Sequence, residues 1–244
     1  YKRQALDSST VYQRLCKTRD LYPDRPAVSF QLKSDAHYKA TTLSWSELTT
    51  KVTQAANLFR SLGVGPKDVV AYLLPTTHET LITLMGGMTC GIVAPINPTL
   101  EPESIAALLR ETDAKVLVTL RAFPKTNVSD LASQAVALSP NIKTVIELDL
   151  LPHLSGISRL IVPLIRPKNS TQHSAKIIDF NQSLALQNDT ELTFKEDLTD
   201  PHCAFFHTGG TTGMPKIAQH RHTGVLYNGW IASSLIFSED DIIM

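Results

Sequence analysis

Between residues 44 and 148 the apolar positions alternate between a helical and an extended period. A capping box, Ser44-Trp-Ser-Glu47, opens a helix whose apolar residues recur at steps of four and three: Leu48, Val52, Ala55, Phe59 and Leu62. Gly63 follows at the position where helices commonly end. The next run, residues 68–75, is almost continuously apolar, as expected of a parallel strand buried on both faces. This stretch predicts a helix that packs on a sheet.

The same alternation continues to residue 148. Thr76-x-x-Glu79 is predicted to cap a helix that extends to Cys90, in which Gly86-Gly87 allows another backbone to approach closely. Further elements are predicted in this order: strand 92–96, a helix from Glu101, strand 115–119, helix 128–137 and strand 143–148. Strand–helix–strand units of this length imply right-handed crossovers. We therefore expect an α/β fold with a mainly parallel sheet flanked by helices.

The flanking parts of the chain are less regular. Short elements are predicted there: a helix at 9–17, strands at 27–32 and 41–43, and a helix at 179–187. Residues 160–165 form an apolar run between Arg159 and Arg166 that could be a short helix or a strand. This basic, apolar patch could contact a membrane or a fatty substrate. A solvated connection is the favoured interpretation.

Composition limits the class of protein. With 244 residues and 43% hydrophobic composition, the chain can bury a sizeable core. Lysine plus arginine and aspartate plus glutamate both number 23, so nothing indicates a nucleic-acid or anionic-membrane partner. Three dispersed cysteines favour reduced, mostly buried thiols and a cytoplasmic location. There is no signal-peptide core, and no apolar run approaches the length of a membrane span.

The stretch from Cys203 to Lys216 carries the candidate chemistry. An apolar run, Cys203 to Phe206, predicts a buried strand that leads into the loop Thr208-Gly-Gly-Thr-Thr-Gly-Met-Pro-Lys216. Three glycines leave backbone N–H groups accessible, threonines add hydroxyl donors, and the lysine adds a positive charge. This combination suits a polyphosphate. The Walker pattern is not met, because Pro215 precedes the lysine, and the dinucleotide pattern is only half met.

The loop resembles T-S-G-T-T-G-x-P-K, the phosphate loop of the adenylate-forming superfamily of acyl-CoA synthetases, peptide-synthetase adenylation domains and beetle luciferases. Gly209 is a departure, since it stands where the motif usually has serine. The run His222 to Asn228 is similar to the helix start that follows the loop in this superfamily. Residues 43–75 and 87–119 extend the resemblance, so that it covers about half of the chain.

The resemblance implies a two-step reaction. A carboxylic acid, of fatty type by the run after Lys216, would attack ATP to give an acyl-adenylate and pyrophosphate, and coenzyme A would then take the acyl group. The residues implied to bind the β- and γ-phosphates, with Mg²⁺ bridging, are Thr208, Gly209, Gly210, Thr211, Thr212, Gly213 and Lys216. His207 and His222 are possible flanking residues. His222 could alternatively cap its own helix.

The resemblance also implies what lies elsewhere. The adenine-contacting segment, the ribose-binding aspartate and the catalytic lysine of the lid domain come after the loop in this superfamily and have no counterpart here. Residues 1–244 are therefore expected to be an incomplete N-terminal portion of the large AMP-binding domain. Alone, they are expected to be inactive as a ligase and to self-associate through surfaces left open.

Other functions stay open at this point. One is an adenylation enzyme that loads a carrier protein, and another is a non-catalytic nucleotide-binding or scaffolding module. Four histidines near the loop (His202, His207, His220 and His222) could be zinc ligands, but neither C-x-x-C nor H-E-x-x-H is present. A serine hydrolase is disfavoured because no G-x-S-x-G accompanies them.

Overall fold

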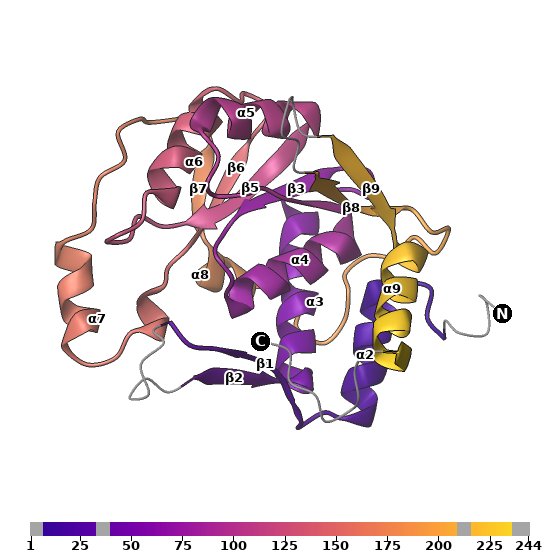
Figure 1. Cartoon of the computed structure of the whole chain (residues 1–244). Helices are drawn as coiled ribbons and strands as arrows, with labels where there is room; N and C mark the ends of the chain where they lie inside the picture. Colours follow the sequence, from indigo (N-terminus) through magenta and orange to yellow (C-terminus); the bar gives the residue numbers. More distant parts are fainter. Residues whose placement is uncertain (1–6, 33–39, 209–215, 236–244) are drawn as a thin grey trace.

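The main layer of the molecule is a seven-stranded sheet in the order β7-β6-β5-β3-β4-β8-β9 (Figure 1). The computed structural model describes residues 7–32, 40–208 and 216–235. The strands are β3 (Val69–Leu73), β4 (Ile92–Pro95), β5 (Ala114–Leu120), β6 (Thr144–Leu148), β7 (Lys176–Asp179), β8 (His202–His207) and β9 (Ile217–Arg221). Neighbouring strands pair in parallel, except that β8 and β9 are antiparallel. The predicted α/β class is confirmed.

Helices cover both faces of this sheet. The helices α5 (Pro102–Glu111) and α6 (Val128–Ala137) lie on one face, and α3 (Trp45–Ser61), α4 (His78–Cys90) and α8 (Phe180–Ala185) lie on the other (Figure 1). Right-handed crossovers on the two sides of β3 place successive helices on opposite faces. Outside these layers lie α2 (Val11–Leu21), α9 (His222–Leu235), a hairpin of β1 (Pro26–Phe30) and β2 (Thr41–Ser44), and the irregular turns η1 (Leu151–His153), α7 (Ile157–Ile161) and η2 (Val162–Leu164).

The N-terminal cap of α3 is the one that the sequence predicted, whereas the cap of α4 lies one residue later than predicted. Ser44 and Glu47 form the predicted capping box, and Gly63 adopts a φ of +85° after the last turn of α3. In α4 the capping box is made by Thr77 with Thr80, so the prediction of a cap by Thr76 and Glu79 is wrong. Glu79 instead accepts from His153, 74 residues later, at 2.9 Å.

Close packing of α3 on α4 builds the centre of the core. A Cβ added at Gly86 would lie 2.7 Å from Ala55 Cβ, which confirms that this glycine permits a close backbone approach. A Cβ at Gly87 would lie 2.9 Å from Val93 on β4. Phe59 is completely buried in the same layer. A leucine-sized side chain at Gly86 would push α4 away from α3, and one at Gly87 would push it away from β4; overpacking of that kind is destabilising.

Local patterns did not predict the two edge strands, β7 and β9. β7 is four residues long and β9 has no buried residue, so neither shows the apolar run of a central strand. For residues 160–165 the sequence left a short helix and a strand as alternatives. The structure forms helical turns there as far as Leu164. Among the described helices, none is long and apolar enough to cross a membrane.

All three cysteines are free thiols. Cys16 is half-buried, and Cys90 and Cys203 are buried. Burial raises the pKa of the Cys90 and Cys203 thiols to about 12. Both thiols therefore stay protonated at neutral pH and act as small apolar core residues rather than as nucleophiles.

Candidate functional site

The predicted phosphate loop begins at the carboxyl edge of the parallel sheet. β8 ends at His207, and its parallel neighbour β4 ends at Pro95. The ring Nδ1 of His207 lies 3.4 Å from the carbonyl oxygen of Pro95, so these two strand ends meet. Open α/β sheets bind their ligands outside the carboxyl ends of the strands. The loop is thus placed where a ligand site is expected.

Hydrogen bonds close the base of this loop. The Thr208 N–H donates to the Lys216 carbonyl at 2.9 Å, and the Thr208 hydroxyl donates to the same oxygen at 3.2 Å. His207 and Ile217 pair across the antiparallel hairpin next to them. The first and last predicted phosphate ligands are therefore side by side and exposed. The predicted ligands between them, Gly209, Gly210, Thr211, Thr212 and Gly213, lie outside the described residues.

His207 uses its ring to join two strand ends. A carbonyl oxygen can only accept, so Nδ1 carries the hydrogen in the contact with Pro95. In the neutral ring, Nε2 then has no hydrogen to donate, and it is buried without a partner among the described residues. His207, expected to flank the phosphate loop, thus bonds to the backbone of β4 in this structure.

His222 lies at the opposite end of the hairpin from the loop. It follows β9, whose last residue, Arg221, pairs with His202 at the start of β8. The ring is 4% exposed, and its Nδ1 accepts the N–H of Val11 at 3.3 Å. Val11 is the first residue of α2, where helix N–H groups lack partners within the helix. His222 therefore caps α2 rather than its own helix, and it does not flank the phosphate loop.

A comparison with family models decides the relationship that this geometry suggests. The model described as AMP-binding enzyme matches residues 17–244. The chain belongs to this family. Membership places the chain among the adenylate-forming, acyl-CoA ligase-like proteins, and the mainly parallel sheet agrees with their N-terminal domain.

Relatives of this AMP-binding chain are longer than it is. It is 33% identical over 220 residues to marinolic acid–CoA ligase of Pseudoalteromonas sp., covering 90% of the chain and 30% of that protein. It is 26% identical over 235 residues to a long-chain-fatty-acid–CoA ligase of Bacillus subtilis, covering 91% of the chain and 38% of that protein. An acetoacetyl-CoA synthetase from Streptomyces lividans matches in structure with a TM-score of 0.72 and 20% identity, over 91% of this chain and 32% of that one.

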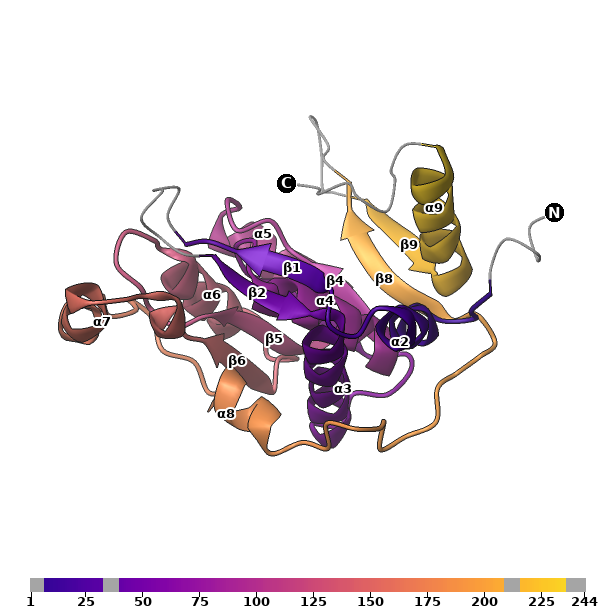
Figure 2. The same ribbon diagram turned by 90° about the horizontal axis from the view of Figure 1, so that it is seen from below.

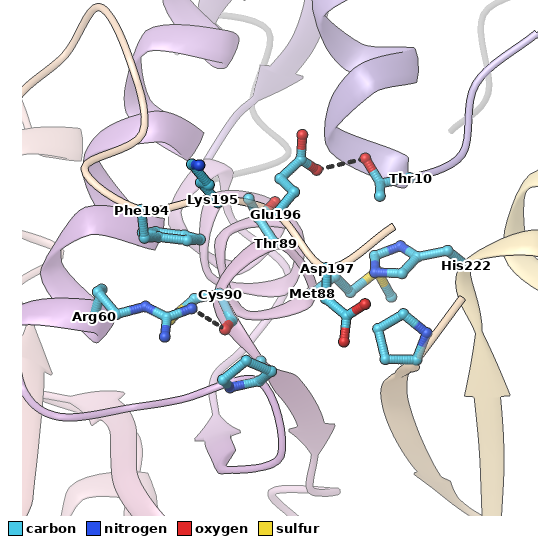
Figure 3. A pocket seen from close by; sticks show the side chains of 13 residues that line it. Thr10, Arg60, Met88, Thr89, Cys90, Phe194, Lys195, Glu196, Asp197 and His222 are labelled. Carbon is cyan, nitrogen blue, oxygen red and sulfur yellow. Dashed lines mark hydrogen bonds between the residues drawn. The ribbon is translucent and has the colours of Figure 1, made fainter. Parts of the chain in front are cut away.

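A small cavity beside His222 is too small for the nucleotide of an AMP-binding protein. Its volume is about 20 Å³, room for roughly one water molecule (Figure 3). Arg60 donates to the Cys90 carbonyl at 2.9 Å, and its guanidinium lies 4.1 Å from the centre of the Phe194 ring. Glu196 accepts from the Thr10 hydroxyl, and burial raises the pKa of its carboxyl. These contacts fasten the segment after α8 to the helices.

A cluster of charged side chains at the carboxyl ends of β5, β6 and β7 escaped the sequence analysis. Arg121 lies 3.2 Å from Glu147 and 3.3 Å from Asp179, and Arg166 donates to both oxygens of Asp149 at 2.8 and 2.7 Å. The cluster borders a polar cavity of about 610 Å³. The available signal was a charged residue at or directly after the end of each strand.

The histidines considered as zinc ligands are spread along the hairpin. His202 and His207 lie at opposite ends of β8, and His222 lies beyond β9. Within residues 7–32, 40–208 and 216–235, no group of three or more His, Cys, Asp or Glu side chains is placed to hold a metal ion. The described structure therefore offers no support for the zinc alternative.

Proposed function

We propose that residues 1–244 form the N-terminal part of a longer enzyme that activates a carboxylic acid, of the fatty class, with ATP and transfers it to coenzyme A. The observation that carries this proposal is the closed base of the loop, with Thr208 bonded to Lys216 at the carboxyl edge of the sheet. Two relatives named as CoA ligases of marinolic acid and of long-chain fatty acids support the acid class.

In this proposal the loop binds the phosphates of ATP that leave as pyrophosphate. The carboxylate oxygen attacks the α-phosphorus, the bond to the bridging oxygen breaks, and negative charge develops on the departing pyrophosphate. Lys216 supplies the one positive charge of the motif, and the glycine N–H groups and threonine hydroxyls supply donors. ATP enters as its Mg²⁺ complex, which neutralises part of the same charge.

Two residues at the base of the loop have distinct proposed parts. The Thr208 hydroxyl hydrogen is engaged by the Lys216 carbonyl, so contact with a phosphate requires that bond to be exchanged. His207 fixes the end of β8 against Pro95 and positions the loop, rather than donating to ATP. The end of β8, from which the loop starts, would then already be fixed at the carboxyl edge of the sheet before ATP binds.

The test is carboxylate-dependent exchange of pyrophosphate into ATP by the complete protein that carries this chain. Lys216→Ala is expected to lower the exchange by one to several orders of magnitude, about 1.4–4 kcal/mol of activation free energy. Its unfolding midpoint should not change, because Lys216 is exposed. The matched control is Lys143→Ala. Lys143 is exposed directly before β6, at the amino ends of the parallel strands, whereas the loop lies at their carboxyl ends.

Each outcome bears on a separate part of the proposal. Wild-type exchange in Lys216→Ala would remove the assignment of the loop. Release of ADP and orthophosphate would indicate an ordinary ATPase instead. Exchange that is intact while the acyl group passes only to a carrier protein would leave adenylation in place and replace coenzyme A as the acceptor. Nucleotide binding without exchange of any acid would favour the non-catalytic module.

A further inference from the structure

A short helical protrusion, residues 154–165, stands out from the sheet at the end opposite to β9 (Figures 1 and 2). It contains α7 and η2, and its buried apolar side chains are Leu154 and Val162. The other large apolar side chains face solvent: Ile157 is 73% exposed, Leu160 74% and Leu164 84%, and Ile161 and Ile165 are also exposed.

Both ends of this protrusion are firmly attached. On its N-terminal side, His153 forms a buried contact with Glu79 at 2.9 Å. On its C-terminal side, Arg166 binds Asp149 through two hydrogen bonds and also donates to the Ala122 carbonyl at 2.8 Å. The exposed apolar side chains are thus presented on a fixed support. Soluble proteins rarely keep such a patch in water unless it has a partner.

The charged side chains that the protrusion and its flanking segment contribute are all cationic, whereas the carboxylates Glu79, Asp130 and Asp149 come from other elements and are paired with His153, Ser170 and Arg166. The whole chain has equal numbers of cationic and anionic residues, so net charge alone suggests no anionic partner. Residues 150–178, however, contain no aspartate or glutamate, whereas Arg159, Arg166, Lys168 and Lys176 all lie within them. Arg166 is paired with Asp149, and the other three cations are exposed. Exposed apolar side chains flanked by exposed cations match a lipid bilayer whose headgroups are anionic and whose interior is apolar.

We propose that the protrusion docks the protein on the surface of an anionic lipid bilayer. Ile157, Leu160 and Leu164 enter the boundary between headgroups and acyl chains, and Arg159 and Lys168 contact the lipid phosphates. The contact is peripheral, with no segment crossing the bilayer. This inference goes beyond the proposed reaction and does not depend on it.

The shape of the protrusion favours a lipid surface over a protein partner. The protrusion is convex, and a bilayer accepts an apolar knob without a matching pocket.

The experiment measures co-sedimentation of the complete protein with vesicles. Wild-type protein is expected to bind vesicles of phosphatidylcholine mixed with phosphatidylserine, and to bind more weakly at high salt or with phosphatidylcholine alone. The double substitution Leu160→Ser, Leu164→Ser is expected to weaken binding at least about ten-fold, because it removes the apolar groups that enter the bilayer. Arg159→Glu is expected to weaken binding several-fold on the mixed vesicles only.

Leu186→Ser is the matched control, because Leu186 is also 84% exposed but lies at the end of α8. It should bind vesicles like the wild type. Unchanged melting temperatures of all variants would show that they fold. The proposal is overturned if the wild type stays in the supernatant with mixed vesicles, or if Leu186→Ser binds as weakly as the double variant. It is equally overturned if the double substitution instead dissociates a protein oligomer and leaves vesicle binding intact.

Discussion

The strands β3 and β9 belong to one sheet, yet they are stabilised in different ways. Every residue of β3 is buried, and α4 beside it packs against α3 and the sheet along most of its length. No residue of β9 is buried, and His222 is the one buried residue of α9, although that helix contains no aspartate, glutamate, lysine or arginine. The centre of the molecule and β8 are held by apolar packing, with Cys203 and Ala204 completely buried, whereas β9 is held mainly by its hydrogen bonds to β8.

This difference separates stability from the proposed chemistry. Apolar packing accounts for most of the free energy of folding, and it is concentrated around β3, α3 and α4. The hairpin is fastened by Arg221 and Thr223, which bond to Asp200, and by His222, which bonds to Val11. A loop that must admit and release ATP gains from such a support, since regions with few buried apolar groups open at lower cost.

The largest expected effect on the free energy of unfolding appears when a phenylalanine of each region is replaced by alanine. Phe59→Ala should lower the free energy of unfolding by about 3–5 kcal/mol, because Phe59 is completely buried and its removal leaves a cavity. Phe206→Ala on β8 should cost about 1–2 kcal/mol, since that ring is 37% exposed and packs edge-on against His220. Urea unfolding of both variants measures the difference. Equal losses would mean that the hairpin is as firmly packed as the core.

A smaller effect is expected where a polar side chain joins the two regions. Asn57 on α3 is buried and uses its whole amide: Nδ2 donates to the Asn188 and Glu191 carbonyls, and Oδ1 accepts from the Thr193 N–H and hydroxyl. These partners lie on the segment that leads from α8 to β8. Asn57→Ala removes all of these hydrogen bonds from a buried position and should lower the free energy of unfolding by about 1–3 kcal/mol.

Asn127 provides the control for Asn57. It is exposed at the start of α6 and makes no side-chain hydrogen bond there, so Asn127→Ala should change stability by no more than about 0.5 kcal/mol. Amide hydrogen exchange of residues 188–200 should quicken in Asn57→Ala and stay unchanged in the control. If exchange in this segment is the same in both variants, Asn57 does not hold it.

The elements that the sequence predicted are those whose information is local. The helix from Ser44 to Gly63 is specified by its own cap, period and terminating glycine, and all three are confirmed. The cap of α4 was misplaced by one residue because Thr76-x-x-Glu79 fits the usual sequence pattern of a capping box, whereas Thr77-x-x-Thr80, which forms the box, does not. Only the distant His153 determines that Glu79 has another partner.

Long-range contacts explain the rest of what the sequence could not predict. The phosphate loop is predicted from its own residues alone, but the role of His222 depends on Val11, 211 residues earlier. The edge strands β7 and β9 are short and polar, and they become strands only because β6 and β8 offer hydrogen-bonding edges. The pairing of Arg121 with carboxylates from β6 and β7 likewise follows from the strand order.

The smallest predicted effect is a dependence of stability on pH at the base of the hairpin. Burial lowers the pKa of His222, while the nearby carboxylates Asp197 and Asp200 oppose this shift. Protonation of Nδ1 would also break the bond from Val11 and put a positive charge at the N-terminus of α2, where the helix dipole disfavours it. The folded protein therefore takes up this proton less readily than the unfolded chain does.

The stability contributed by neutral His222 is present above the ordinary histidine pKa of about 6.5 and is lost as the pH falls from there through the lowered value. His222→Asn keeps an acceptor near the position of Nδ1 but cannot titrate in this range. We expect its unfolding free energy to fall less steeply than that of the wild type between about pH 6.5 and 5. His78, whose pKa burial also lowers, acts in the same direction and remains in both proteins. The comparison uses His220→Asn on β9, half-buried, as the matched substitution. Parallel curves for His222→Asn and the wild type would show that His222 does not titrate as the capping geometry requires.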